Sequence, residues 1–542
     1  MAGNPCYTRW AKGSVGHKLD RYELDKSELD KDKLPERETP GGAVTLWRSP
    51  ARWKLTLGLI FALSLAMRFW KIGQFNTLVF DEVYFAKFAD NYLTQTPFFD
   101  AHPPLSKYII AVGIWIGSHI PIGRDTMNDA VGTLRTTFSY RWLNGLVGSF
   151  IPLVLWAIAW ELSRSWRLAT IAAALLAMDG LFLVESRYGL NNIYLVLFGL
   201  LGQYCFLKVL ATFNPQQDLG RSRQKKRRAW FTLAGLFLGA TVSIKWNGAG
   251  FWFVPWSFWL TAKLYHWWTH RKSPPKPTPQ TEQWRSPLNF LAQISVVSMG
   301  LYLVLVPAVL YCWLWIPHLL LNPDRNLWDV NLAILNVHQN VGGNDIHPYC
   351  SPWYSWPLLL RPLAYFYARV ADPNSPLDYD NLKPDIPDGV SPVIFDVHAM
   401  GNPILWWLSV LALAIAAAGL AQYLWQRRPL NPVRLSNSSW FLLFTLGNYS
   451  GNLLLWLRVT RCTFLYHYMG ALTFAILTLA WMVNRCLDHR DSYWRWWGVF
   501  ALGAIATGFI FWLPVYLGLP LSQTGWSMRV WNFGRPWLPN WI

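Results

Sequence analysis

One short stretch of the chain, LVFDEVYFAKFADNYLTQTPFFDAHPPLSK, begins at Leu78 and contains five ionisable residues of particular interest. They are Asp81, Glu82, Asp100, His102 and Lys107. A carboxylate can take a proton from a hydroxyl nucleophile. Lysine and arginine can hold a phosphate and stabilise the charge that develops as it leaves. The stretch therefore has the residue types needed to transfer a group from a phosphate to a hydroxyl.

Further charged residues lie near this stretch in the expected topology. They are Arg68, Arg141, Arg187 in ESRYGLNN (185–192), and His347. Each site also has an ordinary explanation: paired carboxylates suit a solvated loop, His102-Pro103-Pro104 suits a rigid turn, and Lys107 or Arg141 can snorkel to an interface. Ionisable groups at an apolar boundary are costly and usually functional. Their shared location favours a reaction centre.

Repeated apolar segments surround these residues. The chain is 53% hydrophobic and 14% charged, against about 25% charged in soluble proteins. Segments near the bilayer-spanning length of about 20 residues predict an all-α integral membrane protein with about eleven transmembrane helices. The predicted spans are 54–73, 142–162, 167–185, 188–212, 230–247, 249–265, 290–319, 403–426, 437–457, 463–483 and 496–518. Residues 108–122 are predicted to be interfacial or re-entrant.

The charges of the connecting loops predict the orientation. The short loops SRSWR, RSRQKKRR, HRKSPPKP, QRRPLNPVR and NRCLDHR are basic, whereas residues 320–402 hold nine acidic and four basic residues. By the positive-inside rule the amino terminus is cytoplasmic and the protein is a multi-pass protein of the cell (plasma or inner) membrane. The net charge of +18 is then explained by orientation and anionic lipid, without nucleic acid.

We predict three regions. Residues 1–50 form a cytoplasmic mixed-charge tail, 51–520 the multi-spanning domain, and 521–542 an outer carboxy-terminal tail. Two outer loops, 74–141 and 320–402, are too aromatic for disorder and are expected to fold on the membrane surface, as amphipathic helices. The six cysteines show no paired spacing, and we assign them no role.

The expected topology places the charged cluster outside, where a nucleotide sugar does not occur. It therefore favours a lipid-linked sugar donor. A sugar phosphate leaves readily, so one base and a cationic cradle suffice for inverting transfer, whereas glycoside hydrolysis needs two carboxylates. We predict no cofactor and no metal among the site residues, although a divalent ion could assist where carboxylates meet phosphate.

Five ordered motifs, spread over residues 50–520, resemble those of the protein O-mannosyltransferases, which are multi-spanning C-type glycosyltransferases. They are VFDEVYFAKFADNYL, FFDAHPPLSK, ESRYGLNNIYLV, HPYCSPWYSWPLLLRP and TRCTFLYHYMGALTF. The resemblance implies that Asp81 and Glu82 are the catalytic pair, with Asp81 as the base. It implies a polyprenyl-phosphate mannose donor and serine or threonine acceptors on secreted or membrane proteins.

The same resemblance predicts that Arg68, Asp100, His102, Lys107, Arg141, Arg187 and His347 bind donor phosphate or substrate. The loop 320–402 has no room for the β-trefoil insertion of the eukaryotic enzymes, so the chain resembles the compact bacterial type. Two alternatives remain. One is a transferase of this architecture that acts on another sugar with a lipid or glycan acceptor. The other is a transporter, which the absence of an internal repeat disfavours.

Overall fold

The computed structural model describes residues 50–213, 220–272, 287–340, 342, 346–370, 392–426, 436–534 and 539–542. The chain divides into two compact units, Met1–Arg52 and Trp53–Ile542. The tail predicted for residues 1–50 lies outside the described residues, apart from Pro50.

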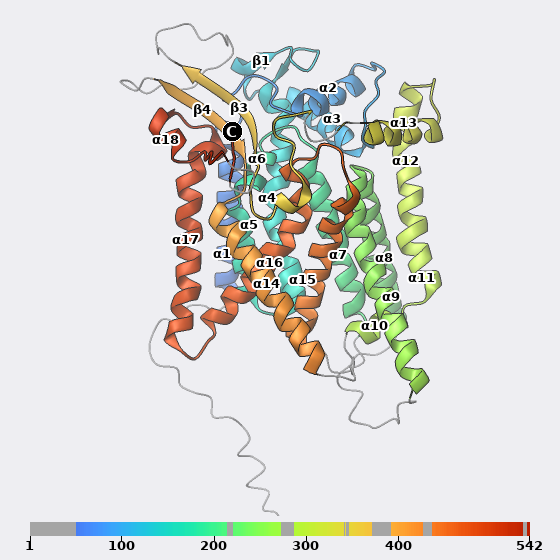
Figure 1. Ribbon diagram of the computed structural model, residues 1–542. Helices are drawn as coiled ribbons and strands as arrows, with labels where there is room; N and C mark the ends of the chain where they lie inside the picture. Colours follow the sequence, from blue (N-terminus) through green and yellow to red (C-terminus); the bar gives the residue numbers. More distant parts are fainter. Residues whose placement is uncertain are drawn as a thin grey trace, which may run out of the picture. The chain divides into compact units, whose positions relative to one another are not determined.

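Helices make up most of the described chain (Figure 1). They are α1 (Pro50–Phe69), α2 (Glu82–Leu93), α3 (Leu105–Ser118), α4 (Thr137–Ser163), α5 (Trp166–Ala177), α6 (Gly180–Glu185), α7 (Asn192–Ala211), α8 (Arg221–Val242), α9 (Ala249–Lys272), α10 (Pro287–Gln293), α11 (Val296–Gly300), α12 (Val306–Leu321), α13 (Leu327–Asn340), α14 (Pro403–Gln426), α15 (Asn437–Leu453), α16 (Met469–Leu487), α17 (Ser492–Leu517) and α18 (Gln523–Ser527). A π-helical segment, Leu301–Leu305, joins α11 to α12.

Six of the described helical segments are long and apolar enough to cross a membrane: Thr137–Ser163, Asn192–Ala211, Val296–Leu321, Pro403–Gln426, Leu465–Leu487 and Ser492–Leu517. The predicted span 167–185 is instead broken into α5 and α6. Asp179 lies at this break, where its side chain caps α6 by accepting from Phe182 N (3.0 Å) and also accepts a bond from Trp406 Nε1 (2.6 Å). The count of eleven spans stays a prediction.

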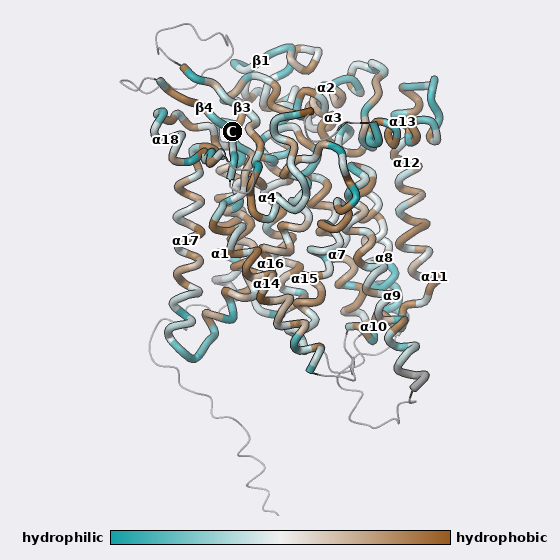
Figure 2. Tube along the Cα trace, in the orientation of Figure 1, coloured by the Kyte–Doolittle hydropathy of each residue, from teal (hydrophilic) through white to brown (hydrophobic). Residues whose placement is uncertain are grey.

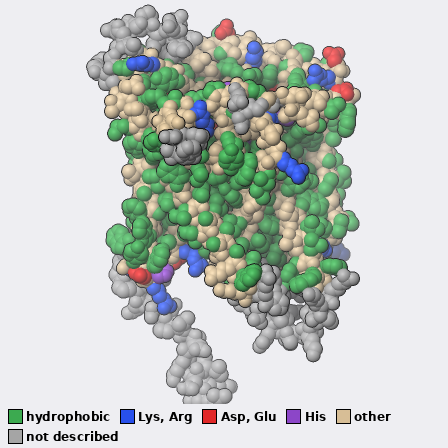
Figure 3. Space-filling model, in the orientation of Figure 1, with side chains coloured by type: hydrophobic (Ala, Val, Ile, Leu, Met, Phe, Trp, Pro, Cys, Tyr) green, Lys and Arg blue, Asp and Glu red, His purple; other side chains and the backbone are tan. Residues whose placement is uncertain are grey.

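Hydropathy agrees with a membrane environment. Figure 2 shows mainly apolar helices between two more polar ends, and on the face drawn in Figure 3 hydrophobic side chains cover the middle. Large apolar side chains are exposed, for example Val297 (78%) and Leu320 (77%). Such a surface needs lipid around it.

The fold is mainly helical, but the expectation that it is all-α is wrong for the segments predicted to be outer loops and for the carboxy-terminal segment, which contain short β-strands. Strands β3 (Leu363–Val370), β4 (Val393–Ala399) and β5 (Leu521–Ser522) form an antiparallel sheet in the order β3-β4-β5. A second pair joins β1 (Met127–Asn128) to β2 (Arg135–Thr136). The sequences LAYFYARV and VIFDVHA are rich in aromatic and β-branched residues, which favour strands over amphipathic helices. The expected surface helices do occur as α2, α3 and α13.

These surface elements gather at one end of the helical bundle, where Figure 1 shows β3, β4, α2, α3 and α13, while α10 lies at the other end. The carboxy-terminal segment is packed against this end. Its strand β5 pairs with β4, the side chain of Trp541 is buried, and Arg361 Nη1 donates to the backbone oxygen of Asn540 (2.9 Å). The segment predicted as a tail is thus part of the folded unit.

Candidate active site

The two adjacent carboxylates of the first motif point to different surroundings. Glu82, the first residue of α2, is fully buried and accepts bonds from Arg141 Nε (2.9 Å) and Nη2 (2.7 Å). It also accepts from the backbone nitrogens of Val79 (3.0 Å) and Gly189 (2.8 Å). Its carboxylate is therefore fully engaged by the protein.

Asp81 is only half-buried and makes a single described side-chain bond, from Tyr466 Oη to Oδ2 (3.2 Å). The residue before it, Phe80, has a positive φ of 47°, which is uncommon for a residue with a bulky side chain. The Phe80 ring is held by four aromatic neighbours, including a stacked Tyr365 (5.0 Å) and an edge-on His347 (6.0 Å). This turn separates the directions of Asp81 and Glu82.

Lys245 supplies a cation beside Asp81. It follows α8, and its Nζ lies 4.9 Å from the centre of the Tyr466 ring and 5.6 Å from that of Phe85. Its one described hydrogen bond goes to Asn192 Oδ1 (2.9 Å). An ammonium group has three donors, so Lys245 keeps capacity for a ligand.

A chain of hydrogen bonds continues from Lys245. Asn192 Nδ2 donates to Glu185 Oε2 (3.1 Å), and the Tyr365 hydroxyl donates to Glu185 Oε1. Tyr365 lies at an irregularity in the β3–β4 register, between the pairs of Ala364 and Phe366. Such bulges re-aim a side chain. The bulge thus brings the β3-β4-β5 sheet into contact with residues at the ends of α6 and α7.

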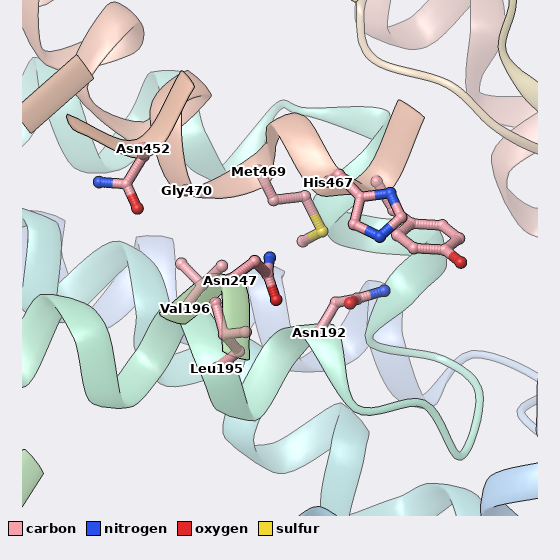
Figure 4. Close-up of a pocket in the computed structure, with 9 residues that line it drawn as sticks. Asn192, Leu195, Val196, Asn247, Asn452, His467, Met469 and Gly470 are labelled. Atoms are coloured by element: carbon pink, nitrogen blue, oxygen red, sulfur yellow. The ribbon is translucent and has the colours of Figure 1, made fainter. Parts of the chain in front are cut away.

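A small pocket adjoins Lys245 and Tyr466. Its walls are Asn192, Leu195, Val196, Asn247, Asn452, Tyr466, His467, Met469 and Gly470. In Figure 4 the side chains of Asn192, Asn247, Met469 and His467 lie around the same space. Amide, imidazole and hydroxyl groups suit a polar ligand such as a sugar or a phosphate.

The HPP segment borders the same region. The His102 ring lies 6.1 Å from the ring of Phe85 and 5.4 Å from that of His338, on α13. Burial, followed by nearby cations, lowers the pKa of His102 well below its usual value, so the ring is neutral at pH 7. Lys107 Nζ bonds Asp100 Oδ2, His102 O (2.8 Å) and Pro103 O (3.2 Å). With all three donors used, Lys107 holds this turn in place.

The three predicted arginines, Arg68, Arg141 and Arg187, donate to acceptors of the protein. Besides Glu82, Arg141 donates to the backbone oxygens of residues 72, 75 and 77. Arg187 Nη1 donates to the backbone oxygens of Met67 (2.8 Å) and Trp70 (2.7 Å), and Arg68 Nη1 to Ser64 Oγ (2.5 Å). All three arginines are buried, and the Nε atoms of Arg68 and Arg187 have no hydrogen-bond partner in the described structure.

Sequence reasoning also missed a disulfide. Cys350 and Cys462, 112 residues apart, are bonded, so the view that the cysteines have no role is wrong for this pair. Two bonds between Ser351 and Thr463 flank it (2.8 and 2.7 Å). The disulfide links the loop that contains Cys350 to the segment that carries Tyr466. The only sequence signal was that both cysteines lie within motifs that resemble those of the protein O-mannosyltransferases, HPYCSPW and TRCTF.

Comparisons with known proteins identify the family. The family model of the dolichyl-phosphate-mannose-protein mannosyltransferases matches residues 58–321. The family model of the C-terminal four-transmembrane region of protein O-mannosyltransferases matches residues 324–537. Polyprenol-phosphate-mannose–protein mannosyltransferases of Mycolicibacterium smegmatis and Mycobacterium tuberculosis are 25% and 24% identical. The alignments cover 90% of this chain and 93% and 92% of those proteins.

The fold has a counterpart among solved structures. The Saccharomyces cerevisiae protein O-mannosyltransferase Pmt1-Pmt2 complex bound to the sugar donor contains a chain that superposes with a TM-score of 0.68 at 14% identity. The match covers 91% of this chain and 94% of that one. Taken with the two family matches, which together extend over most of the sequence, this shows that the chain belongs to the protein O-mannosyltransferase family.

Proposed function

We propose that this protein transfers mannose from a polyprenyl-phosphate mannose donor to a serine or threonine hydroxyl of a protein, with inversion at the sugar carbon. The observation that carries the proposal is the half-buried carboxylate of Asp81 beside Lys245, next to a pocket of amide and imidazole groups. The activities named for the mycobacterial relatives support the choice of donor and acceptor.

The proposed step uses one base. The acceptor hydroxyl gives its proton to an Asp81 oxygen while its own oxygen bonds to the anomeric carbon. On the opposite face, the bond from that carbon to the phosphate oxygen breaks, and the lipid phosphate leaves with the electron pair. Lys245 is placed to stabilise the negative charge on the phosphate. Arg461, whose charge acts on Lys245, provides a second cation nearby.

The remaining predicted site residues receive positioning roles in this proposal. Glu82 and Arg141 fix the start of α2, and Lys107 with Asp100 fixes the HPP turn. Arg68 and Arg187 brace the end of α1. His102 and His347 remain candidates for contact with the substrate, since both border the aromatic surroundings of Asp81 and Lys245.

The activity itself is tested with purified protein. Incubation with polyprenyl-phosphate mannose and a peptide that contains serine and threonine is expected to give a mannosylated peptide. A peptide with alanine at every serine and threonine is the control and should stay unmodified. Transfer from the donor to a lipid or glycan, with the peptide untouched, would instead support the alternative acceptor class.

We further propose that the active site faces the outside and that eleven helices cross the membrane. The basic short loops support this, and so does the Cys350–Cys462 disulfide, because disulfides persist in oxidising compartments. Both cysteines adjoin the elements around Asp81.

This orientation predicts a labelling pattern. A single cysteine at Asn91 on α2, in a background without native cysteines, should react with a membrane-impermeant thiol reagent added to intact cells. A cysteine at Gln224 on α8 should be protected until the membrane is opened. The second outer position suggested by the sequence, Asp378, lies outside the described residues, so exposed Tyr367 on β3 replaces it. The reverse pattern would refute the orientation.

The environment of Asp81 predicts the pH dependence. Burial raises the pKa of this carboxyl above its ordinary value and Asp100 adds to the effect, while Lys245 and the Tyr466 hydrogen bond oppose it. The base is the charged form, so kcat/KM should be full above this raised pKa and fall as the pH drops through it. The midpoint should lie above about 3.9, the value of a free aspartate.

Tyr466→Phe sharpens this test. It removes a bond that lowers the pKa of Asp81, so the acid limb of the kcat/KM profile should move to higher pH. Circular dichroism across the same range controls for unfolding. If the acid limb of the kcat/KM profile does not move in this variant, the limb does not report the titration of Asp81.

Lys245→Met should lower kcat/KM by about 10²-fold, the usual cost of losing a donor to developing charge in a buried site. The loss should appear in kcat/KM for the sugar donor, while the KM for the peptide stays unchanged. Lys87→Met, which removes an exposed lysine from α2, is the matched control and should keep normal activity. A rise in peptide KM alone would place Lys245 at the acceptor instead.

A further inference from the structure

A second polar pocket lies far from Asp81, around the amino-terminal part of α8. Its walls are Phe213, Gln224, Arg227, Arg228, Phe231, Gln293, Ile294, Ser295, Ser298 and Tyr302, from the end of α7, from α8 and from the α10–α11 junction. They enclose about 770 Å³ of empty space, part of it open. Arg227 precedes Val242, the last residue of α8, by fifteen positions, which is about 22 Å along a helix. Lys245 lies beyond that end.

The polar walls of this pocket suit an anion. Arg227 is fixed in place, because its guanidinium lies 3.6 Å from the ring centre of Phe213 and donates through Nε to Thr212 Oγ1 (3.0 Å) and through Nη2 to Thr212 O (3.3 Å). Its Nη1 donors have no such partner among the described residues. Arg228 lines the same space, and none of the lining residues is acidic.

Hydroxyl and amide groups complete the polar side. Ser295 caps α11 by accepting from Ser298 N (3.1 Å), so the first turn of the α11–α12 helix faces this region with its hydroxyls. Two arginines, two serines and two glutamines offer more donors than one carboxylate can use. A phosphate has enough acceptor oxygens for them.

The other walls are apolar and open towards lipid. The rings of Phe231 and Tyr302 stack at 4.8 Å. Next to the pocket, Val296 (65% exposed), Val297 (78%) and Leu301 (42%) present an apolar surface, and the segment Val296–Leu321 is one of the six apolar enough to cross a membrane. An acyl chain can lie along this surface while the phosphate occupies the polar side.

We propose that this pocket binds the phosphate headgroup of an anionic phospholipid, in the leaflet at the amino-terminal end of α8. Basic pockets between membrane helices bind such headgroups. The bound lipid joins α8 to α10 and α11. This site does not depend on the transfer reaction, so either proposal can fail without the other.

The test measures thermal unfolding of the purified protein in detergent. Added phosphatidylglycerol should raise the Tm, whereas phosphatidylcholine should not. In R227Q/R228Q the affinity for phosphatidylglycerol should fall by about tenfold or more. K225Q/K226Q loses the same charge from exposed positions outside the pocket and should respond like the unchanged protein. If the double variant does not fold, R228Q alone, at an exposed position, is judged by the same criterion.

Two results would overturn the proposal. One is a phosphatidylglycerol response that persists in R227Q/R228Q, and the other is an equal loss in K225Q/K226Q. Inorganic phosphate is the third ligand whose effect on the Tm is measured. If it alone reproduced the whole shift in an arginine-dependent way, the pocket would bind a free anion and the lipid assignment would be wrong. Native mass spectrometry should show one fewer tightly bound phosphatidylglycerol in R227Q/R228Q.

Discussion

Asp81→Asn is expected to lower kcat by about 10²- to 10⁴-fold, the usual cost of losing a general base. The asparagine keeps the shape of the side chain and can still accept a bond from Tyr466. It cannot take the proton of the acceptor hydroxyl. Because Asp81 is half-buried and binds no cation directly in the described structure, the variant should fold and bind the donor normally.

The measurement compares single-turnover transfer with donor binding and thermal stability. Asp129→Asn is the matched control, since Asp129 is an exposed carboxylate in the segment between α1 and α4, and its replacement should leave turnover unchanged. Near-normal turnover in Asp81→Asn, with normal donor affinity, would remove Asp81 from the role of base.

Residue spacing located this region, and the family resemblance named Asp81 as the base, but the spacing gives no physical reason to divide the roles of the two carboxylates. Asp81 and Glu82 are adjacent and chemically alike, so spacing alone does not separate them. The separation comes from a turn with positive φ at Phe80 and from distant partners, Arg141 and the backbone of Gly189. Those partners meet Glu82 only after α4 and the segment following α6 have packed against the start of α2.

The same limit applies to the cations. Sequence reasoning selects arginines and lysines near an outer boundary, but not which of them have free donors. Arg141 and Lys107 donate to acceptors of the protein. Lys245 is not among the residues predicted from the sequence, yet it lies beside Asp81 with a single described hydrogen bond. The number of donors that a lysine or arginine keeps free for a ligand depends on which acceptors pack around it in the folded protein.

Local pattern predicted the helices well where one segment sufficed. The boundaries of α14 match the predicted span 403–426. Local pattern did not predict contacts between segments that are far apart in the sequence. Examples are the pairing of β4 with both β3 and β5 and the bond between Cys350 and Cys462. Such contacts depend on which segments the bundle brings together, and a single sequence does not record that.

Breaking the Glu82–Arg141 pair should destabilise the protein by about 3–5 kcal/mol, because it leaves one buried charge without its partner. Both side chains are fully buried, and the Nη2–Oε2 distance is 2.7 Å. Glu82→Gln and Arg141→Gln should each lower the Tm strongly. The double variant should lose less than the sum of the two, since contacting residues are not additive.

Asp488→Asn provides the matched control. It breaks the Arg167–Asp488 pair, whose side chains are 33% and 59% exposed, and exposed pairs contribute about 0–1 kcal/mol. Its Tm should therefore change little. The outcome also decides the role of Glu82. If Glu82→Gln keeps its stability and donor binding but loses turnover, Glu82 acts in the reaction as the motif suggests, and the buried pair is not what fixes the start of α2. A large loss of stability, with residual activity in the protein that remains folded, assigns Glu82 and Arg141 to holding Asp81 in place.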